Sequence, residues 1–418
     1  MKKISKILAF LITVTMVSVF FACANSGGSG SNGDSESDNS WKPDGIYTIT
    51  IADGITNGTV TADATSAHYD STVTLSITPQ EGCRLVEIYV VIANGDKLWL
   101  SGTGNTRTFT MPPCNVMVSA VFVKWTIMEF GSWPQSLIAD DVTVNDGAES
   151  KIVGSNTYYK GSDGEWYAEV NYEYYKVEPI KWRVLTTNYN GTGKKLLLAD
   201  NILTACAYYD YSVNRTSSEG STVYPNNYEY SKMRAFLNGY SYQKKSSDAA
   251  SQETDESFLG KGFLQTAFTL EEQARIATTS VINNARSTNP DANPTQWGGG
   301  NNPYASDTPT FDKIFLLSEQ EVTKNDYGFP SYNYSCGTDN TRIRIGTAFA
   351  IASGVSRNSY GIEGYGEWWT LRSPDYLSYS EFYNDWSDRL HEVDEEGKAN
   401  STGGVGGKHG VVPALCLE

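Results

Sequence analysis

The first part of the chain with a clear pattern is a series of short runs in which apolar and polar residues alternate. Runs such as GTVTA (58–62), TVTLSITP (72–79) and VMVSAVFV (116–123) are rich in β-branched residues, and turn residues such as TNG and ANGD occur between the runs. Alternation with a period of two predicts strands that bury one face. We therefore predict a small all-β module over residues 45–124.

The longer segment that follows, residues 125–418, has a mixed pattern. The runs IKWRVL (180–185) and KLLLAD (195–200) predict strands. Long loops rich in Tyr, Asn, Ser, Gly and Pro lie near residues 207–230, 240–258 and 284–311. Loops of this length in a compact domain are usually functional or disordered. We predict a mixed α+β domain for this segment.

Four short helices are predicted in the larger domain. Two of them follow an S/T-x-x-E capping box, in which each of the two side chains accepts a hydrogen bond from the backbone N–H of the other residue. These boxes are Thr269 with Glu272 and Ser318 with Glu321. The other two helices cover residues 231–237 and the run AFAIASG (348–354), where the final glycine, Gly354, ends the helix.

The N-terminus has the layout of a signal peptide. Lys2, Lys3 and Lys6 precede an apolar run from Ile7 to Phe21. This run is too short for a membrane-spanning helix, and positive charges before an apolar core are typical of secretory signals. We therefore expect the chain to be exported.

A cysteine follows the apolar run and precedes a polar segment, residues 23–44, rich in Gly, Ser, Asn and Asp. The arrangement resembles a bacterial lipoprotein signal, although Phe20 and Phe21 are bulkier than the usual residues. The resemblance implies a signal peptide over residues 1–22, acylation of Cys23 by fatty acids such as palmitate, and a flexible tether. The alternative is an ordinary secretory signal in which Cys23 has no role.

Charge and histidine content narrow the possible functions. The net charge is −16, and removal of the three leader lysines makes it more negative. Phosphate backbones repel such a protein, so we expect no nucleic-acid partner. His68, His391 and His409 are the three histidines and lie far apart in the sequence. So few histidines make a zinc site or a Ser-His-Asp triad unfavourable, and we expect neither a metal nor catalytic residues.

Five cysteines remain beside the one in the leader. They are Cys83, Cys114, Cys206, Cys336 and Cys416. An exported protein can form disulfides, although an odd number leaves one thiol over. Cys83 and Cys114 both fall in the small module and are the pair we expect to bond. The alternative is that these cysteines are small buried apolar residues.

Three motifs in the small module resemble the divergent internalin-type B repeat of bacterial surface proteins. They are GTVTA, TVTLSITPQEG (72–82) and TFTMPPCNVMVSAVF (108–122). The resemblance covers this module and implies a spacer or adhesion unit without catalysis. We find no second copy, so we expect one stalk domain.

An ordered series of motifs runs through the larger domain. The series is FGSWPQ (130–135), PIKWRVL (179–185), SKMRAFLN (231–238), DKIFLLSEQEV (312–322), EWWTLRSPD (367–375) and GVVPALCLE (410–418). It resembles an uncharacterised bacterial family, a domain of unknown function. It is also similar to the C-type lectin-like fold that formylglycine-generating enzymes share with the variable proteins of diversity-generating retroelements. This implies a C-type lectin-like domain over residues 125–418. Thr370 and Val412 depart from the family pattern.

The segment 375–400 is the predicted ligand-binding region. In the retroelement variable proteins the diversified residues precede the last strand, where this segment lies. Its Tyr, Ser, Asn and Asp, with a few Trp and Arg, are typical of recognition surfaces and suit sugar rings or proteins. The residues we select are Tyr379, Tyr383, Asn384, Asp385, Trp386 and Arg389. The alternative is a solvated polar hairpin without a ligand.

The dipeptide Asn384-Asp385 also resembles part of the calcium motif of long-loop C-type lectins. The partner motif is missing, and calcium prefers six to eight oxygen ligands. We therefore expect no cofactor, with calcium as the alternative.

The segment EWWTLRSPD is predicted to be scaffold and not ligand site. Its position in the ordered series implies that at least one of Trp368 and Trp369 packs in the core. Arg372 is expected to be a buried brace paired with an acidic residue.

The sequence therefore predicts a surface-exposed, lipid-anchored protein of a bacterial cell envelope. Its C-terminal domain is expected to bind an extracellular glycan or protein without catalysis. Formylglycine-type copper chemistry needs two neighbouring thiolates, and Cys336 and Cys416 are far apart in the sequence. The alternatives are an exported enzyme acting on envelope or host glycans and a structural envelope protein.

Overall fold

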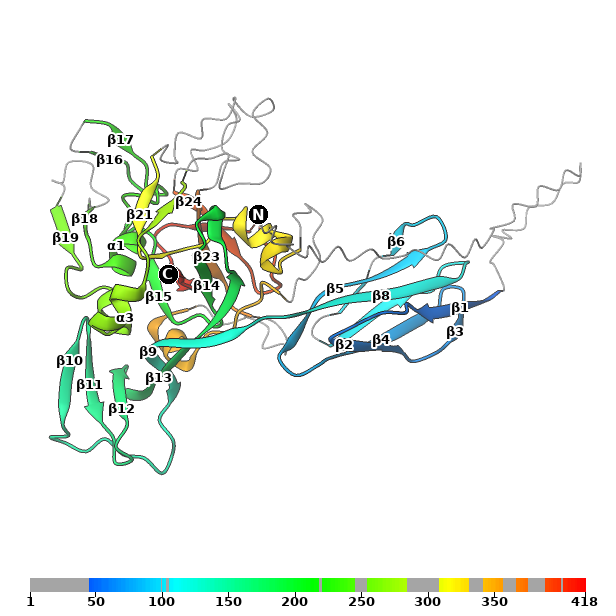
Figure 1. The fold of residues 1–418 in the computed structure, drawn as a ribbon, viewed down its shortest axis with the longest axis horizontal. Helices are drawn as coiled ribbons and strands as arrows, with labels where there is room; N and C mark the ends of the chain where they lie inside the picture. Colours follow the sequence, from blue (N-terminus) through cyan, green and yellow to red (C-terminus); the bar gives the residue numbers. More distant parts are fainter. Residues whose placement is uncertain are drawn as a thin grey trace, which may run out of the picture.

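The chain folds into two bodies that lie end to end (Figure 1). In this computed structural model, strands β1–β8 form an elongated repeat module and the later elements form a larger head. The structure describes residues 45–98, 100–102, 105–217, 220–244, 254–283, 308–330, 341–355, 366–374, 388–399 and 401–418. With 47% of the described residues in strands and 11% in helices, the fold is mostly β, so the predicted α+β head is less helical than expected.

Two sheets enclose the core of the repeat module. Alternation in β8 is regular, since Val116, Val118 and Ala120 are buried while Met117 and Val121 are exposed. The predicted all-β pattern is therefore confirmed. One sheet has the order β3 (Ser66–His68), β1 (Ile46–Ile51), β8 (Val116–Lys124), β5 (Cys83–Ile92) and β6 (Lys97–Leu98); the other has β2 (Gly58–Ala62), β4 (Thr72–Pro79) and β7 (Thr106–Thr110).

The predicted disulfide between Cys83 and Cys114 is wrong. Cys83 is a buried free thiol. It pairs with Lys124 at one end of the β5–β8 ladder, whereas Cys114 precedes Val116 at the other end. At about 3.3 Å per residue the ladder separates the two cysteines by far more than the roughly 7 Å that a disulfide can span between Cα atoms.

The junction between module and head is short and packed. β8 leads through the buried Trp125 almost directly into β9 (Ile127–Leu137). The guanidinium of Arg183 lies 4.4 Å from the centroid of the Trp125 ring. Asp200 bonds to Arg183 and lies 3.4 Å from Nη2 of Arg84 in the module. The module is thus held against the head by specific contacts.

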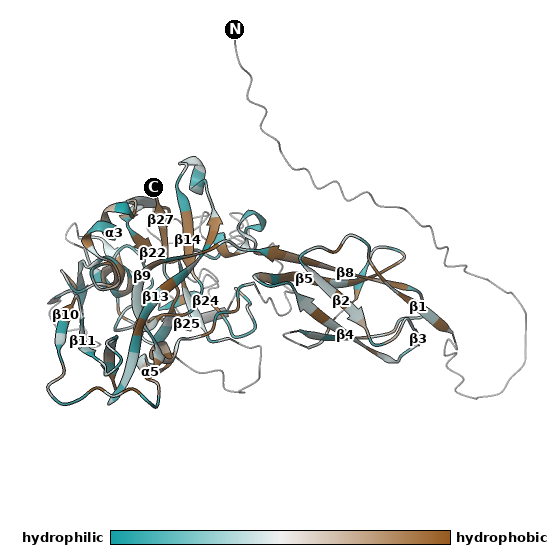
Figure 2. Ribbon diagram, turned by 60° about the horizontal axis from the view of Figure 1, so that its bottom comes forward, coloured by the Kyte–Doolittle hydropathy of each residue, from teal (hydrophilic) through white to brown (hydrophobic). Residues whose placement is uncertain are grey.

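The main sheet of the head is built on two almost wholly buried strands, β14 and β27. Their continuous apolar runs occupy the core, as the hydropathy colours in Figure 2 show. The predicted strands at 180–185 and 195–200 are confirmed as parts of β13 and β14. The order is β10 (Ser150–Val153), β11 (Asn156–Lys160), β12 (Trp166–Val170), β13 (Glu173–Thr186), β14 (Lys195–Ala199), β27 (Ala414–Leu417) and β22 (Ile314–Phe315), with β9 also paired to β13.

A second sheet and three small hairpin-like pairs complete the strands of the head. The second sheet has the order β15 (Thr204–Ala207), β26 (Lys408–Val411), β23 (Trp369–Pro374), β24 (Arg389–Val393) and β25 (Ser401–Gly404). The small pairs are β16 (Arg215–Thr216) with β17 (Thr222–Val223), β18 (Ser241–Lys244) with β19 (Thr254–Ser257), and β20 (Thr279–Val281) with β21 (Thr310–Asp312).

Three of the four predicted helices are present and capped. Ser231 caps α1, Thr269 and Glu272 form the predicted capping box of α3, and Gly354 ends α5 with a φ of 112°. The helices are α1 (Lys232–Asn238), α2 (Phe263–Ala267), α3 (Leu270–Arg275) and α5 (Ala348–Ser353), with 3₁₀ turns η1 (Tyr189–Gly191), η2 (Glu321–Thr323) and η3 (Asn325–Tyr327). None of the helices in the described part of the chain has the length and apolar composition needed to cross a membrane.

The helix predicted after Ser318 is wrong. Ser318 and Glu321 make both reciprocal backbone bonds of a capping box, at 2.9 and 3.2 Å, but only the 3₁₀ turn η2 follows. Glu321 is also the partner of Tyr189, at 2.6 Å, and of Arg372, at 2.5 Å. The bonds to Tyr189 and Arg372 hold the Glu321 side chain in this position, and the chain does not continue as a helix.

Residues 367–374 of the segment EWWTLRSPD form β23 and the two residues before it, inside the head. Trp369 is fully buried and donates from Nε1 to the carbonyl of Arg342 at 3.1 Å. Arg372 is buried, and its Nη1 donates to the carbonyl of Leu316 at 2.7 Å and to Glu321. Leu316 directly follows β22, so Arg372 joins the second sheet to the main sheet.

The pair formed by Arg372 and Glu321 makes stability depend on pH. Burial raises the pKa of Glu321, but the Arg372 guanidinium outweighs burial and holds the pKa of this carboxyl below its usual range. A lowered pKa in the folded state contributes stability above the unfolded value, about 4.3, and this contribution is lost as pH falls through the folded value.

Glu321→Gln is expected to lower the free energy of unfolding by about 3–5 kcal/mol at neutral pH, because it leaves a buried guanidinium without its charge partner. The difference from the wild type should shrink in acid, as denaturant unfolding across the pH range would show. Glu165→Gln, which removes an exposed carboxylate, is the control and should be nearly neutral. An equal loss in acid and at neutral pH would contradict the ion-pair account.

Candidate ligand-binding cleft

The main sheet opens at one end, between β11 and β12. The ladder between these strands stops at Tyr158 and Ala168. The ladders on both sides continue further, to the pair of Val153 and Asn156 in β10–β11 and to Val170 with Glu173 in β12–β13. The strands therefore diverge beyond Tyr158. In Figure 1, β10, β11 and β12 lie at the end of the molecule away from the repeat module.

Two contacts hold the strands apart. The β10–β11 turn rests on α2, where the backbone N–H of Ser155 donates to Oγ1 of Thr266 at 3.1 Å. Gly154 has a φ of 56°, and a Cβ there would lie 2.0 Å from that oxygen, so only glycine fits. The β12–β13 turn is fastened to α5, because Asn171 donates from Nδ2 to the carbonyl of Ala352 at 3.0 Å.

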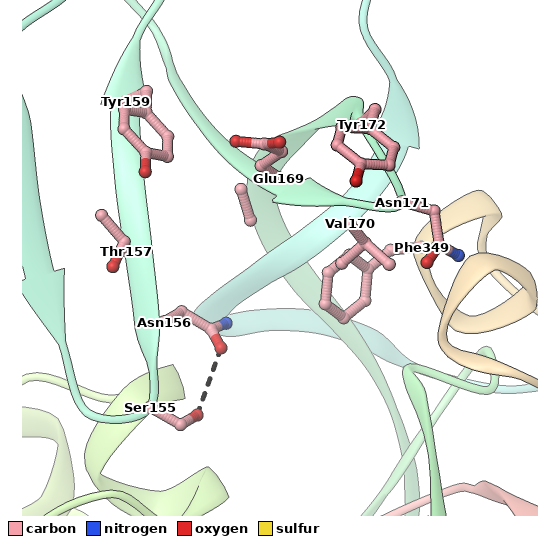
Figure 3. Close-up of a pocket in the computed structure, with 10 residues that line it drawn as sticks. Ser155, Asn156, Thr157, Tyr159, Glu169, Val170, Asn171, Tyr172 and Phe349 are labelled. Atoms are coloured by element: carbon pink, nitrogen blue, oxygen red, sulfur yellow. Dashed lines mark hydrogen bonds between the residues drawn. The ribbon is translucent and has the colours of Figure 1, made fainter.

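The opening is a cleft of about 510 Å³. This volume is in the range of small-molecule sites in proteins. Its floor contains the buried ring of Phe349 from α5, and its walls carry hydroxyl, amide, carboxylate and phenol groups (Figure 3). The lining residues are Ser155, Asn156, Thr157, Tyr159, Ala168, Glu169, Val170, Asn171, Tyr172 and Phe349. Such a lining suits a ligand rich in polar groups.

Tyr172 at the rim of the cleft is in an unusual conformation. Asn171 and Tyr172 form the two-residue turn between β12 and β13, with φ of 53° and 66°. Both values are positive, as in a type I′ turn, where glycine is preferred at the second position. A non-glycine residue there costs roughly 1–2 kcal/mol. The side chain is 95% exposed, so little packing offsets this cost.

Glu169 is the charged group in the cleft. In the view of Figure 3 it lies between Tyr159 and Tyr172. Burial, and then the negative charge of Glu169, raise the pKa of the neighbouring Tyr174 phenol. The ring of Tyr174 meets that of Tyr159 edge to face at 5.9 Å. The cleft wall thus combines a carboxylate with aromatic rings.

A second, smaller cavity of about 200 Å³ is lined by Trp368, Glu392, Lys408 and His409. His409 contacts Glu392 through Nδ1 and the carbonyl of Gly404 through Nε2, the latter at 2.7 Å. Burial lowers the pKa of His409, but these two bonds outweigh it and raise the pKa above its ordinary value. Lys408 donates to the carbonyl of Ser353 at 2.9 Å. The charged groups of this cavity are thus engaged in the fold.

The residues selected from the sequence that the structure describes are not among those that line the cleft. Cys23 and the predicted ligand residues Tyr379, Tyr383, Asn384, Asp385 and Trp386 lie outside the described residues. Arg389 is described: it begins β24 in the second sheet, is exposed, and its carbonyl accepts from Asn226 at 2.7 Å. Trp368 is half-buried at the smaller cavity, while Trp369 and Arg372 lie in the core.

Sequence reasoning missed Tyr159, Glu169, Asn171 and Tyr172. One local feature was available, the dipeptide Asn-Tyr between the runs that form β12 and β13. Asn at the first position of a two-residue turn is common, and a bulky residue in place of glycine at the second is the unusual feature. Within the described residues no group of three or more His, Cys, Asp or Glu side chains is placed to hold a metal ion.

The fold and the cleft define a mostly β protein in which a repeat module carries a larger head. Residues 192–418, more than half of the chain, match the family described as Domain of unknown function (DUF6273), and the chain belongs to this family. Residues 47–126 match the divergent InlB B-repeat domain, which confirms the predicted bacterial repeat. Comparison with curated proteins and with solved structures found no match. Except for Phe349, the cleft residues precede the segment that matches the DUF6273 family.

Tyr172→Gly is expected to stabilise the protein by about 0.5–1 kcal/mol. Removing the left-handed strain raises the free energy of unfolding by roughly 1–2 kcal/mol. Glycine also makes the unfolded chain more flexible, which lowers the free energy of unfolding by roughly 0.5–1 kcal/mol. Thermal and denaturant unfolding measure the change. Tyr172→Ala keeps the strain and serves as the control, with stability close to the wild type. A glycine variant clearly less stable than the wild type would contradict the assignment of strain.

Proposed function

We propose that this protein is a lipid-anchored protein of a bacterial cell envelope that binds an extracellular glycan without catalysis. Acyl chains on Cys23 hold it in a membrane, residues 23–44 serve as the tether, and the repeat module acts as a stalk. The head is a C-type lectin-like domain, and it holds the ligand in the cleft between β11 and β12.

The observation that carries this proposal is Tyr172. Backbone strain at an exposed residue points to a function, because no packing in the folded protein offsets its cost. The ring stands free at the rim of a cleft of about 510 Å³. Rigid aromatic area beside adaptable amide and hydroxyl groups is typical of recognition surfaces. Asn156 and Thr157 supply such groups on the facing wall.

A glycan is the ligand that suits this lining best. Sugar rings have apolar C–H faces that can lie on a tyrosine ring, and hydroxyl groups that can bond to amide and carboxylate side chains. The mixed polar walls and the open form of the cleft (Figure 3) favour such a ligand over a purely apolar one.

The alternative is an exported enzyme that acts on glycans. Glycosidases place a pair of carboxyl groups across the scissile bond. In the described lining of the cleft, Glu169 is the carboxylate. We therefore favour binding over hydrolysis, and over a purely structural envelope protein, for which strain at Tyr172 would have no use.

Tyr172→Ala is expected to weaken glycan binding about tenfold or more, because an aromatic residue that contacts the ligand commonly carries a large share of the affinity. Tyr172→Phe, which keeps the ring, should bind nearly as the wild type does. Phe311→Ala, which removes a 62% exposed ring elsewhere on the head, is the matched control. The measurement is a glycan array, with and without calcium, followed by calorimetry on the best ligand.

A silent array, or equal binding by the wild type and Tyr172→Ala, would contradict the cleft as the binding site. Loss of binding in Tyr383→Ala and Trp386→Ala, with Tyr172→Ala unaffected, would assign the ligand to the region selected from the sequence.

Labelling with radioactive palmitate in cells is expected to mark the wild-type protein and not Cys23→Ala. Acylation of this cysteine is what anchors the chain, so the variant should also leave the membrane fraction. Equal labelling of both proteins would refute the anchor.

A further inference from the structure

The charge of the cleft suggests which glycans it accepts, an inference that rests on the proposed function. Among the described lining residues Glu169 carries a charge, and no lysine, arginine or histidine lines the cleft. Two lysines of the adjoining strands face other partners: Lys160 pairs with Glu149 at 3.0 Å, and Lys151 lies 4.0 Å from the centroid of the Trp166 ring. A third, Lys176 of β13, lies opposite Tyr167 and is not among the lining residues. The site therefore presents negative charge to a ligand.

Glu169 is also available to a ligand. Its side chain is exposed, and it forms no hydrogen bond or ion pair with any residue that the structure describes. A carboxylate accepts hydrogen bonds at two oxygens and bonds most strongly to a cationic donor. Acidic sugars such as uronic acids would meet like charge here, which disfavours them.

The rings near Glu169 strengthen the case for a cation. Tyr159 and Tyr172 lie on either side of Glu169 in the view of Figure 3. Aromatic faces attract ammonium groups, and aromatic residues form the cages in which proteins recognise them. A cleft lining that combines a carboxylate with two tyrosines therefore suits an ammonium group better than an uncharged hydroxyl.

We propose that the cleft binds glycans that carry a free amine, such as glucosamine residues without an N-acetyl group. The ammonium group bonds to the Glu169 carboxylate, and the sugar ring lies against Tyr172. The amides and hydroxyls of Asn156 and Thr157 bond to the neighbouring hydroxyl groups. The cleft thereby distinguishes deacetylated from acetylated amino sugars.

The test compares a β-1,4-linked glucosamine tetramer with its fully N-acetylated counterpart by calorimetry on the full secreted chain. The wild type is expected to bind the free-amine tetramer about tenfold more tightly, and the preference should fall as salt is raised. Glu169→Gln should reduce the preference to within about twofold while keeping the affinity for the acetylated tetramer. Glu173→Gln removes the same charge at an exposed residue outside the lining and should keep the preference.

The outcomes separate this inference from the proposed function. Equal affinity of the wild type for both tetramers, or a preference that survives Glu169→Gln, overturns the free-amine inference while glycan binding stands. If neither these tetramers nor any glycan on the array binds, both proposals fail.

Discussion

The cleft depends on one constraint, which is that two neighbouring hairpin turns are fastened to two different helices. Ser155 is bonded to Thr266 on α2, and Asn171 to the carbonyl of Ala352 at the end of α5. Left free, β11 and β12 would extend their ladder past Tyr158, since an antiparallel pair gains a backbone bond with each added pair of residues. The contacts with α2 and α5 prevent this extension of the ladder. Both helices pack on the core of the head, whose two sheets are joined to each other. Arg372 joins the two sheets through Leu316 and Glu321 in a fully buried site.

The backbone strain and the exposure of Tyr172 are the observations that favour a function for the cleft. A glycine in the same turn would be more stable, and an exposed ring contributes little packing, so folding alone does not explain the tyrosine. The repeat module and the head share Trp125, Arg183 and Asp200 at their junction, which fixes the direction in which the cleft faces. In Figures 1 and 2, β10 and β11 lie at the end of the head far from the module.

Local patterns in the sequence predicted the elements well and their assembly poorly. The alternating pattern of β8 and the apolar run of β14 follow from which faces of these strands are buried. Such patterns can be read directly from the sequence. The reciprocal bonds of Ser318 and Glu321 formed as expected, yet only a 3₁₀ turn followed, and the same carboxylate binds Arg372 and Tyr189, which are distant in sequence. Cys83 and Cys114 are in one small domain but at opposite ends of a ladder, a matter of register. The cleft was missed for the same reason, since the end of a ladder depends on tertiary contacts.

The family match covers the second half of the chain, whereas most of the cleft is built from residues before it. Most of the proposed binding site thus lies outside the matched segment, and its contents need direct observation. The most direct measurement is a crystal structure of residues 45–418 with the tightest glycan from the array. If the ligand binds in the cleft, the sugar ring is expected to lie against Tyr172, between β11 and β12, with hydrogen bonds to Asn156 and Glu169. A glycan bound elsewhere on the head, with this cleft empty, would contradict the proposed binding site.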